Sequence, residues 1–145
     1  LEGLMTGYAE VRGNPARGVN MTKIAVLTVD ETVRIELQRL EQIIQELGEA
    51  TAAQVIGAAL EQLALALTRT VAAGAAGDLA GVVTHAEQLA RLAWQVGLVS
   101  LAGVAVDVGS CAERQDHTAL AATSARLHRI GNRSLTEIWE APGCR

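Results

Sequence analysis

The feature that most constrains the fold is the spacing of apolar residues, which recur every three or four positions in five segments. This spacing places them along one side of an α-helix, where they can be buried together. The first helix is expected from about Asp30, as its N-cap, to Leu47, with Gly48 as its stop. No segment shows the period-2 alternation that is typical of a strand. The expected stripe of the first helix is Val33, Leu37, Leu40, Ile44 and Leu47.

Glycine and aspartate mark the ends of the other four expected helices, which cover about residues 52–73, 78–96, 98–112 and 116–141. Asp78 and Asp116 are the expected N-caps of the third and fifth helices, and Gly97 marks the turn between the third and fourth. Because the connections are short, neighbouring helices should be antiparallel. The sequence therefore predicts an all-α protein, an antiparallel up-and-down four-helix bundle with an additional N-terminal helix. The apolar stripes of these four helices are Ile56, Leu60, Leu63 and Leu67; Leu79, Val82, Ala86, Leu89, Ala93 and Val96; Leu98, Leu101, Ala105, Val108 and Ala112; and Leu120, Leu127, Leu135 and Ile138.

The chain of 145 residues is half apolar but contains no Phe, so its core must be built from Leu, Ile, Val and Ala. Small side chains of this kind require the helices to approach one another closely, and Ala and Leu also favour helix formation. The length fits one domain. We expect residues 21–145 to form a single helical-bundle domain, because "MTKIAVLTVDE" from Met21 reads like a natural start. Residues 1–20 are expected to be an irregular extension or a tag-like segment.

Charge and composition exclude several classes of function. The net charge of −4 and the pI of about 5.3 argue against nucleic acid as a partner. The longest uncharged run, residues 92–106, is shorter than the roughly 20 residues of a membrane span, so it is expected to be buried core, and no membrane partner is expected. Two cysteines, Cys111 and Cys144, make neither a metal site nor a disulfide framework, which favours a reducing cytoplasm.

The three histidines do not have the spacing of metal ligands. No His follows a Glu by three residues, and the chain contains neither an HExxH motif nor a paired-cysteine motif. No metal and no other cofactor is therefore expected. A Ser-His-Asp or Cys-His triad is not favoured by anything in the sequence, and the chain is expected not to be an enzyme.

From Gly77 to Gly97 the sequence resembles a histidine phosphotransfer (HPt) domain, and the resemblance extends over about residues 30–140. Three features carry it: an opening "GD", an Ala-x-x-Leu-x-x-x-Ala core, and a Val-Gly-Leu turn into the next helix. The matching residues are Gly77 and Asp78; Ala86, Leu89 and Ala93; and Val96, Gly97 and Leu98.

The residues that carry the family's chemistry are replaced. Glu87 stands where the family has its phospho-accepting His, Ala90 where it has a Lys, and Arg91 where it has a Gly. In the family the His attacks phosphorus, the Lys balances phosphate charge and the Gly allows a receiver domain to approach. Glu87 has no neighbouring base or cation suited to promote phosphoryl transfer. The resemblance therefore implies a non-catalytic, cytoplasmic relative that binds a two-component signalling protein, a receiver domain or a histidine kinase.

The expected partner-binding residues lie on one face of the third helix and its flank: Val83, Glu87, Ala90, Arg91 and Trp94. Trp94 is either an anchor for the partner, since Trp is enriched at interface hot spots, or a cover for the bundle end or the N-terminal helix. His85 lies about 200° around the helix from Glu87. It is expected to be a partly buried residue at a helix–helix seam, with a relocated phospho-acceptor as the alternative.

A second set of charged residues lies on the fifth helix, where Arg126, Arg129 and Arg133 share one face. The simpler interpretation is a solvated face, in which Arg133 pairs with Glu137 four residues later. The alternative is a secondary docking patch for an acidic partner, because receiver domains often present an acidic surface. An enzyme that uses this face to hold an anionic substrate needs a pocket with converging charges.

A homodimer is the alternative function for the whole chain. Four apolar residues expected on the outside of the bundle favour it: Trp94, Val99, Val106 and Trp139.

Overall fold

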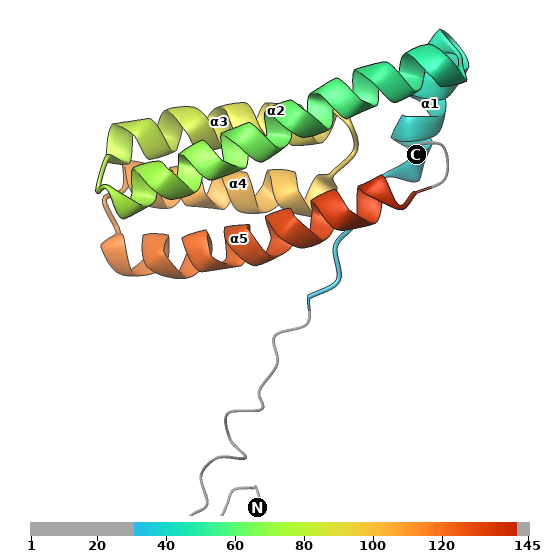
Figure 1. Ribbon diagram of the computed structural model, residues 1–145. Helices are drawn as coiled ribbons and strands as arrows, with labels where there is room; N and C mark the ends of the chain where they lie inside the picture. The colour runs from blue at the N-terminus through green and yellow to red at the C-terminus, as the bar shows by residue number, and fades with distance from the viewer. Residues whose placement is uncertain (1–30, 142–145) are drawn as a thin grey trace, which may run out of the picture. The chain divides into compact units, whose positions relative to one another are not determined.

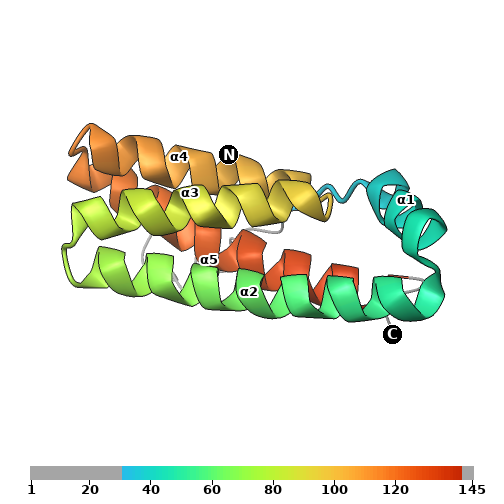
Figure 2. The ribbon, with the colours of Figure 1, turned by 90° about the horizontal axis from the view of Figure 1, so that it is seen from above.

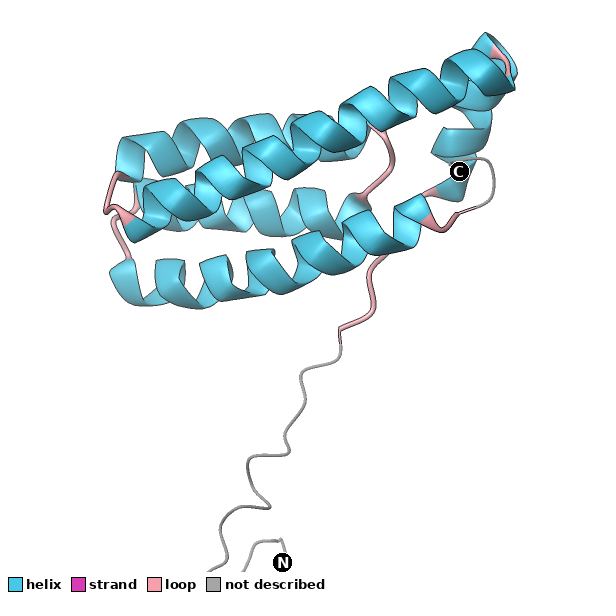
Figure 3. Ribbon diagram, viewed as in Figure 1, coloured by secondary structure: helices cyan, strands magenta, loops and turns pink. Residues whose placement is uncertain are grey.

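The computed structural model describes residues 31–141, which form five α-helices (Figures 1 and 3). The all-α prediction is confirmed, and the predicted second to fifth helices are present to within a few residues. The expected extension 1–20 and its boundary at Met21 lie outside the described residues. The helices are α1 (Leu37–Leu47), α2 (Glu49–Ala75), α3 (Leu79–Gln95), α4 (Val99–Glu113) and α5 (His117–Trp139).

Four of the helices pack along one another. α3 contacts both α2 and α4, and α5 contacts both α4 and α2, whereas α1 packs mainly against α2. Figures 1 and 2 show α2 to α5 side by side. α2 is the longest helix, and its N-terminal part extends past the ends of α3 and α4 towards α1 (Figure 2).

The core contains no aromatic side chain in the described part of the chain, as expected for a protein without Phe. Trp94 and Trp139 are both 55% exposed. The predicted stripes of α2 to α5 are buried or half-buried throughout. Many alanines are buried in the core, and five of those in the described residues are fully inaccessible: Ala52, Ala86, Ala93, Ala102 and Ala105.

Aspartate side chains begin α3 and α5, as predicted. Asp78 Oδ1 accepts a hydrogen bond from the backbone N–H of Gly81 at 3.0 Å, and Asp116 Oδ1 accepts one from Ala119 at 3.1 Å. Each bond satisfies a backbone donor that the first turn of a helix leaves without a partner. The turn between α3 and α4 is made by Gly97, whose φ of +85° is the left-handed conformation that favours glycine.

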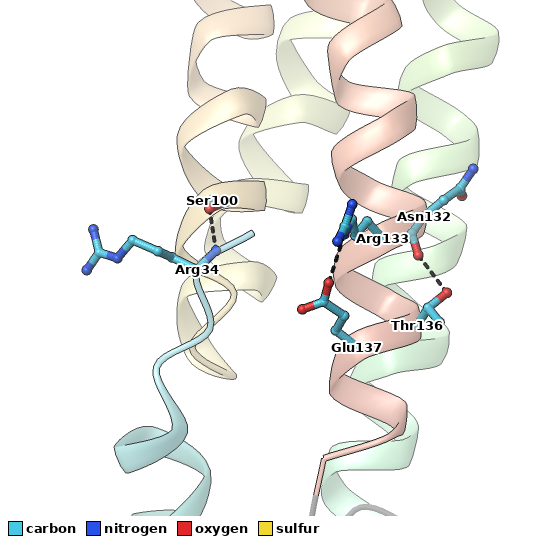
Figure 4. Close-up of polar contacts among 6 residues, drawn as sticks. All are labelled: Arg34, Ser100, Asn132, Arg133, Thr136 and Glu137. Carbon is cyan, nitrogen blue, oxygen red and sulfur yellow. Dashed lines mark hydrogen bonds and ion pairs between the residues drawn. The ribbon is translucent and has the colours of Figure 1, made fainter. Parts of the chain in front are cut away.

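The first helix begins at Leu37, so the predicted start at about Asp30 is wrong for the described residues from 31 onward. Residues 32–36 are extended, and Ile35 forms an isolated antiparallel bridge with Leu98. The backbone N–H of Glu36 donates to Gly97 O at 2.7 Å, and Arg34 N–H donates to Ser100 Oγ at 2.7 Å (Figure 4). These bonds to the turn between α3 and α4 hold the segment out of the helix.

The extended segment alternates in burial, because Val33 and Ile35 are half-buried whereas Thr32, Arg34 and Glu36 are exposed. This alternation accompanies a single isolated bridge, and residues 31–141 form no strand, as predicted. β-Branched residues favour this extended conformation.

The predicted stripe of the first helix is only partly buried. Leu40 is 2% exposed and Ile44 is half-buried, but Leu37 is 50% exposed and Leu47 is 43% exposed. The reason is that α1 packs mainly against one helix, so the ends of its apolar stripe are left uncovered.

α2 is the one helix in the described part that is long and apolar enough to cross a membrane, by length and composition alone. The sequence-based expectation considered only the uncharged run 92–106 and did not consider α2. About 28% of the apolar window of α2 is buried, and the helix packs against α1, α3 and α5. Core helices of soluble proteins meet the same two criteria, so this finding is weak evidence for a membrane.

Replacing Gly97 by Ala should destabilise the protein. A Cβ at this position would lie 2.8 Å from Glu36 O, and the φ of +85° is strained for any L side chain. The expected loss in free energy of unfolding is about 1–3 kcal/mol. The matched control is Gly57→Ala inside α2, where a Cβ meets nothing within 4 Å; it should stabilise by about 0.5–1 kcal/mol. Urea unfolding measures both, and equal effects would contradict the assignment of Gly97.

Loss of a helix cap should have a smaller effect. Asp78→Ala or Asp116→Ala is expected to lower the free energy of unfolding by about 1 kcal/mol each, because one backbone donor of α3 or α5 loses its acceptor. Asp107→Ala, at an exposed position inside α4, is the control and should change the free energy by less than about 0.5 kcal/mol. Thermal or urea unfolding measures all three variants. An equal loss in free energy of unfolding for Asp107→Ala and for the two cap variants would contradict the capping role.

Candidate protein-docking site on α3

Glu87 lies near the middle of α3, and its side chain is 70% exposed. Val83, one turn before it, is half-buried, and Ala90, one turn after it, is buried. These three residues form one side of a shallow groove of about 230 Å³ between α3 and α4, here called the α3–α4 groove. Its other side is formed by residues of α4: Ala105, Val106, Gly109, Ser110 and Glu113.

Small residues make the groove, because they leave room between the two helices. A Cβ built on Gly109 would lie 3.7 Å from the Cβ of Ala86, which is ordinary van der Waals contact, so α4 passes close to α3 here. Above this contact, Ala90 and Ala105 fill little space, and Val106 remains 56% exposed. The groove therefore has an apolar floor that is open to solvent.

The two other predicted partner-binding residues lie beside the groove and do not line it. Arg91 Nη1 is 3.9 Å from Glu87 Oε2, and the two side chains are 66% and 70% exposed. A pair this long and this solvated contributes little to stability. Trp94, one turn further along α3, exposes more than half of its surface. Less than half of the side chain is therefore available to cover the end of the bundle or to pack on the N-terminal helix.

Sequence reasoning placed the docking site on one helix and did not assign the five groove residues of α4 to it, although it expected Val106 on the outside of the bundle. They recur at three- and four-residue steps along one flank of the buried stripe of α4. The same spacing led to the identification of the face of α3. The helical spacing of the α4 residues is therefore visible in the sequence. Only the packing of α3 against α4 shows that their face and the Glu87 face of α3 line the same groove.

The groups around Glu87 bear on whether its carboxylate could accept a phosphoryl group. A carboxylate that is to accept a phosphoryl group needs a base or cations that stabilise the transition state. Glu87 pairs with Arg91 only through the long, solvated contact described above. Within residues 31–141, no three His, Cys, Asp or Glu side chains are grouped so that they could hold a metal ion.

His85 lies on the other flank of the buried stripe of α3 and is half-buried. Its Nδ1 atom is buried and has no hydrogen-bond partner. An acceptor of a phosphoryl group from another protein must be reachable by that protein, and the buried Nδ1 atom is not. His117 and His128 are exposed on α5, where Nε2 of His128 lies 3.3 Å from Nδ2 of Asn132.

The three arginines of the possible secondary patch lie on α5 and not beside the α3–α4 groove. The expected pair is present, since Arg133 Nε donates to Glu137 Oε2 at 2.8 Å (Figure 4). Arg126 is half-buried and Arg129 is exposed. Arg133 therefore forms its ion pair within α5, as the interpretation of a solvated face predicts.

Comparisons of this chain with known protein families, with characterised proteins and with solved structures found no match. Its function is therefore inferred from the geometry of the site together with the HPt resemblance of the sequence.

His85→Leu tests whether the half-buried imidazole is needed for stability. Because Nδ1 has no partner, an apolar side chain of similar size should leave the free energy of unfolding unchanged or raise it by up to about 1 kcal/mol. The control, His117→Leu at an exposed position, should change it by less than about 0.5 kcal/mol. A loss of more than about 1 kcal/mol in His85→Leu alone would show that His85 makes a stabilising polar contact.

Proposed function

We propose that this chain is a non-catalytic, cytoplasmic HPt-like bundle that binds a two-component signalling partner, a receiver domain or a histidine kinase, without phosphotransfer. The observation that carries the proposal is the place of Glu87. It lies mid-helix and exposed, at the rim of the α3–α4 groove, where the resembled family carries its reactive His. A docking surface is retained at this position, while the group that would react is a carboxylate.

The finer architecture belongs to the same proposal. We take α2 to α5 as an antiparallel up-and-down four-helix bundle of the HPt kind, with α1 as the additional N-terminal helix. The residues that match the family support this, since Ala86, Leu89 and Ala93 are fully buried in α3. Gly97 also supports it, because its left-handed φ makes the turn that the family's glycine is expected to make.

The replaced residues explain why no relay step is proposed. Ala90 has no charge with which to balance a phosphate, and it is buried. Arg91 brings a cation near Glu87, but its long and solvated contact does not hold that cation in place for a transferring phosphoryl group. We therefore assign protein docking, without phosphotransfer, to the face of α3 that carries Glu87.

Phosphotransfer assays test the proposal directly. The protein is incubated with autophosphorylating histidine kinases and with phosphorylated receiver domains from the same genome, and both label and binding are measured. The expected result is binding to at least one of them, with no acid-labile label on this chain. Label that disappears in His85→Gln or His117→Gln would overturn the non-catalytic assignment and would show that a relocated histidine is the acceptor. Failure to bind any of these proteins would overturn the two-component assignment.

A homodimer is the second candidate, favoured by exposed apolar side chains. Trp94, Val106 and Trp139 are each more than half exposed, whereas Val99 is half-buried and contributes less than expected. Light scattering at several concentrations separates the two functions. The docking proposal expects the monomer mass throughout, and a mass that doubles with concentration would favour the dimer.

A further inference from the structure

The α3–α4 groove combines an apolar floor with a carboxylate on each side. Glu87 contributes the carboxylate of α3, and Glu113 that of α4; both side chains belong to exposed residues. Asp107, also exposed on α4, adds a third negative charge to that helix. Two arginines lie near these carboxylates: Arg91, whose Nη1 atom is 3.9 Å from Glu87 in solvent, and Arg114, whose Nη1 atom donates to Ser110 Oγ in the groove lining at 3.2 Å. The three carboxylates outnumber these two cations, so the local charge is negative.

We infer that the α3–α4 groove binds an amphipathic helix of a partner protein, one with an aliphatic stripe flanked by Lys or Arg. The inference rests on the part of the proposed function that assigns protein binding to this face of α3. It adds the chemistry of the bound element, which the proposed function leaves open.

The dimensions of the groove favour a helix over a small molecule. Its lining runs over two turns of each helix, from Val83 to Ala90 and from Ala105 to Glu113, or about 12 Å. Two or three turns of a partner helix match this length. The volume of about 230 Å³ lies below the range of roughly 300–1,000 Å³ that is usual for sites of small ligands.

The floor of the groove suits aliphatic side chains. Ala90, Ala105 and Gly109 leave space between α3 and α4, and Val106 and Val83 supply the apolar walls. A helix that lies in such a groove inserts residues spaced three and four positions apart and keeps its polar residues at the rim. Lys or Arg at that rim would meet Glu87 on one side and Glu113 on the other.

Charge decides between the remaining occupants. An anionic lipid surface would bring like charges against Glu87 and Glu113, which is unfavourable. A second copy of this chain, docked groove to groove about a two-fold axis, would bring the same carboxylates together. A cationic helix is the occupant whose charge complements the rim.

Synthetic peptides of about 18 residues serve as the probe, a length that gives a helix several turns. The first has Leu at helical spacing with Lys on both flanks, the second has Glu in place of each Lys, and the third has Gln in place of each Leu. Isothermal titration calorimetry is expected to show binding of the first peptide, at least tenfold weaker binding of the third, and none of the second. Equal binding of the first and third would overturn the helix-in-groove inference, because it would show charge attraction alone.

Two charge-reversal variants locate the binding. Glu87→Lys/Glu113→Lys removes both rim carboxylates and should weaken binding of the first peptide by about tenfold or more. Glu46→Lys/Glu61→Lys makes the same change in net charge at exposed positions of α1 and α2, and should change the affinity by less than about twofold. Equal weakening by both variants would overturn the inference, since it would show non-specific attraction. Circular dichroism checks that each variant is folded.

A third variant tests the apolar contact without a change in charge. Val106→Ser replaces a side chain that is 56% exposed in the groove, so stability should change little while affinity for the first peptide falls about threefold. An unchanged affinity would contradict a contact between the peptide and the groove wall.

The inference and the proposed function can fail separately. If the groove binds the first peptide and Glu87→Lys/Glu113→Lys abolishes this, but no kinase or receiver binds the protein, only the two-component assignment fails. If a receiver or kinase binds the wild-type protein and Glu87→Lys/Glu113→Lys equally well, the two-component assignment stands and the cationic-helix inference fails.

Discussion

Close packing of α3 against α4 is the interaction on which the rest of the structure depends. Ala86 and Ala93 on α3 and Ala102 and Ala105 on α4 are fully buried, and a Cβ built on Gly109 of α4 would lie 3.7 Å from the Cβ of Ala86, so the two helices approach closely there. A core without large aromatic rings gains its stability from many short contacts between small side chains, each of which is weak by itself. Such a core is sensitive to voids, because few neighbours can move to fill them. The same closeness fixes the α3–α4 groove on two rigid helices, which position a binding surface better than loops do.

Much of the fold follows from local features of the sequence. Asp78 and Asp116 cap helices where their position before an apolar run predicts it, and Gly97 makes a turn that only a residue tolerant of positive φ makes easily. The start of α1 does not follow from local features. Val33 fits a helical stripe as well as a strand, and the choice is made by a hydrogen bond between Arg34 and Ser100, which are 66 positions apart.

The candidate site was likewise predictable where it depends on local helical geometry, and not where it depends on the packing of two helices. Glu87, Val83 and Ala90 share a face because of helical geometry, so the sequence alone places them together. Their partners on α4, Val106 and Glu113 among them, could not be assigned to the same groove, because the rotation of one helix against another is set by packing. The charge of the groove comes from both helices and is therefore a property of the fold.

The bridge between Ile35 and Leu98 also has a consequence for how the chain reaches this structure. It closes a loop of the chain that contains α1, α2 and α3 entirely. The entropic cost of closing a loop of this length must be met before the bridge is stable, whereas the turns between successive helices form locally. The bridge therefore joins two segments that lie far apart in the chain, whereas each turn joins neighbouring helices. The segment before α1 is thereby attached to the turn at Gly97 by hydrogen bonds of its backbone. Its position therefore depends on the packing of α3 and α4, which this turn connects.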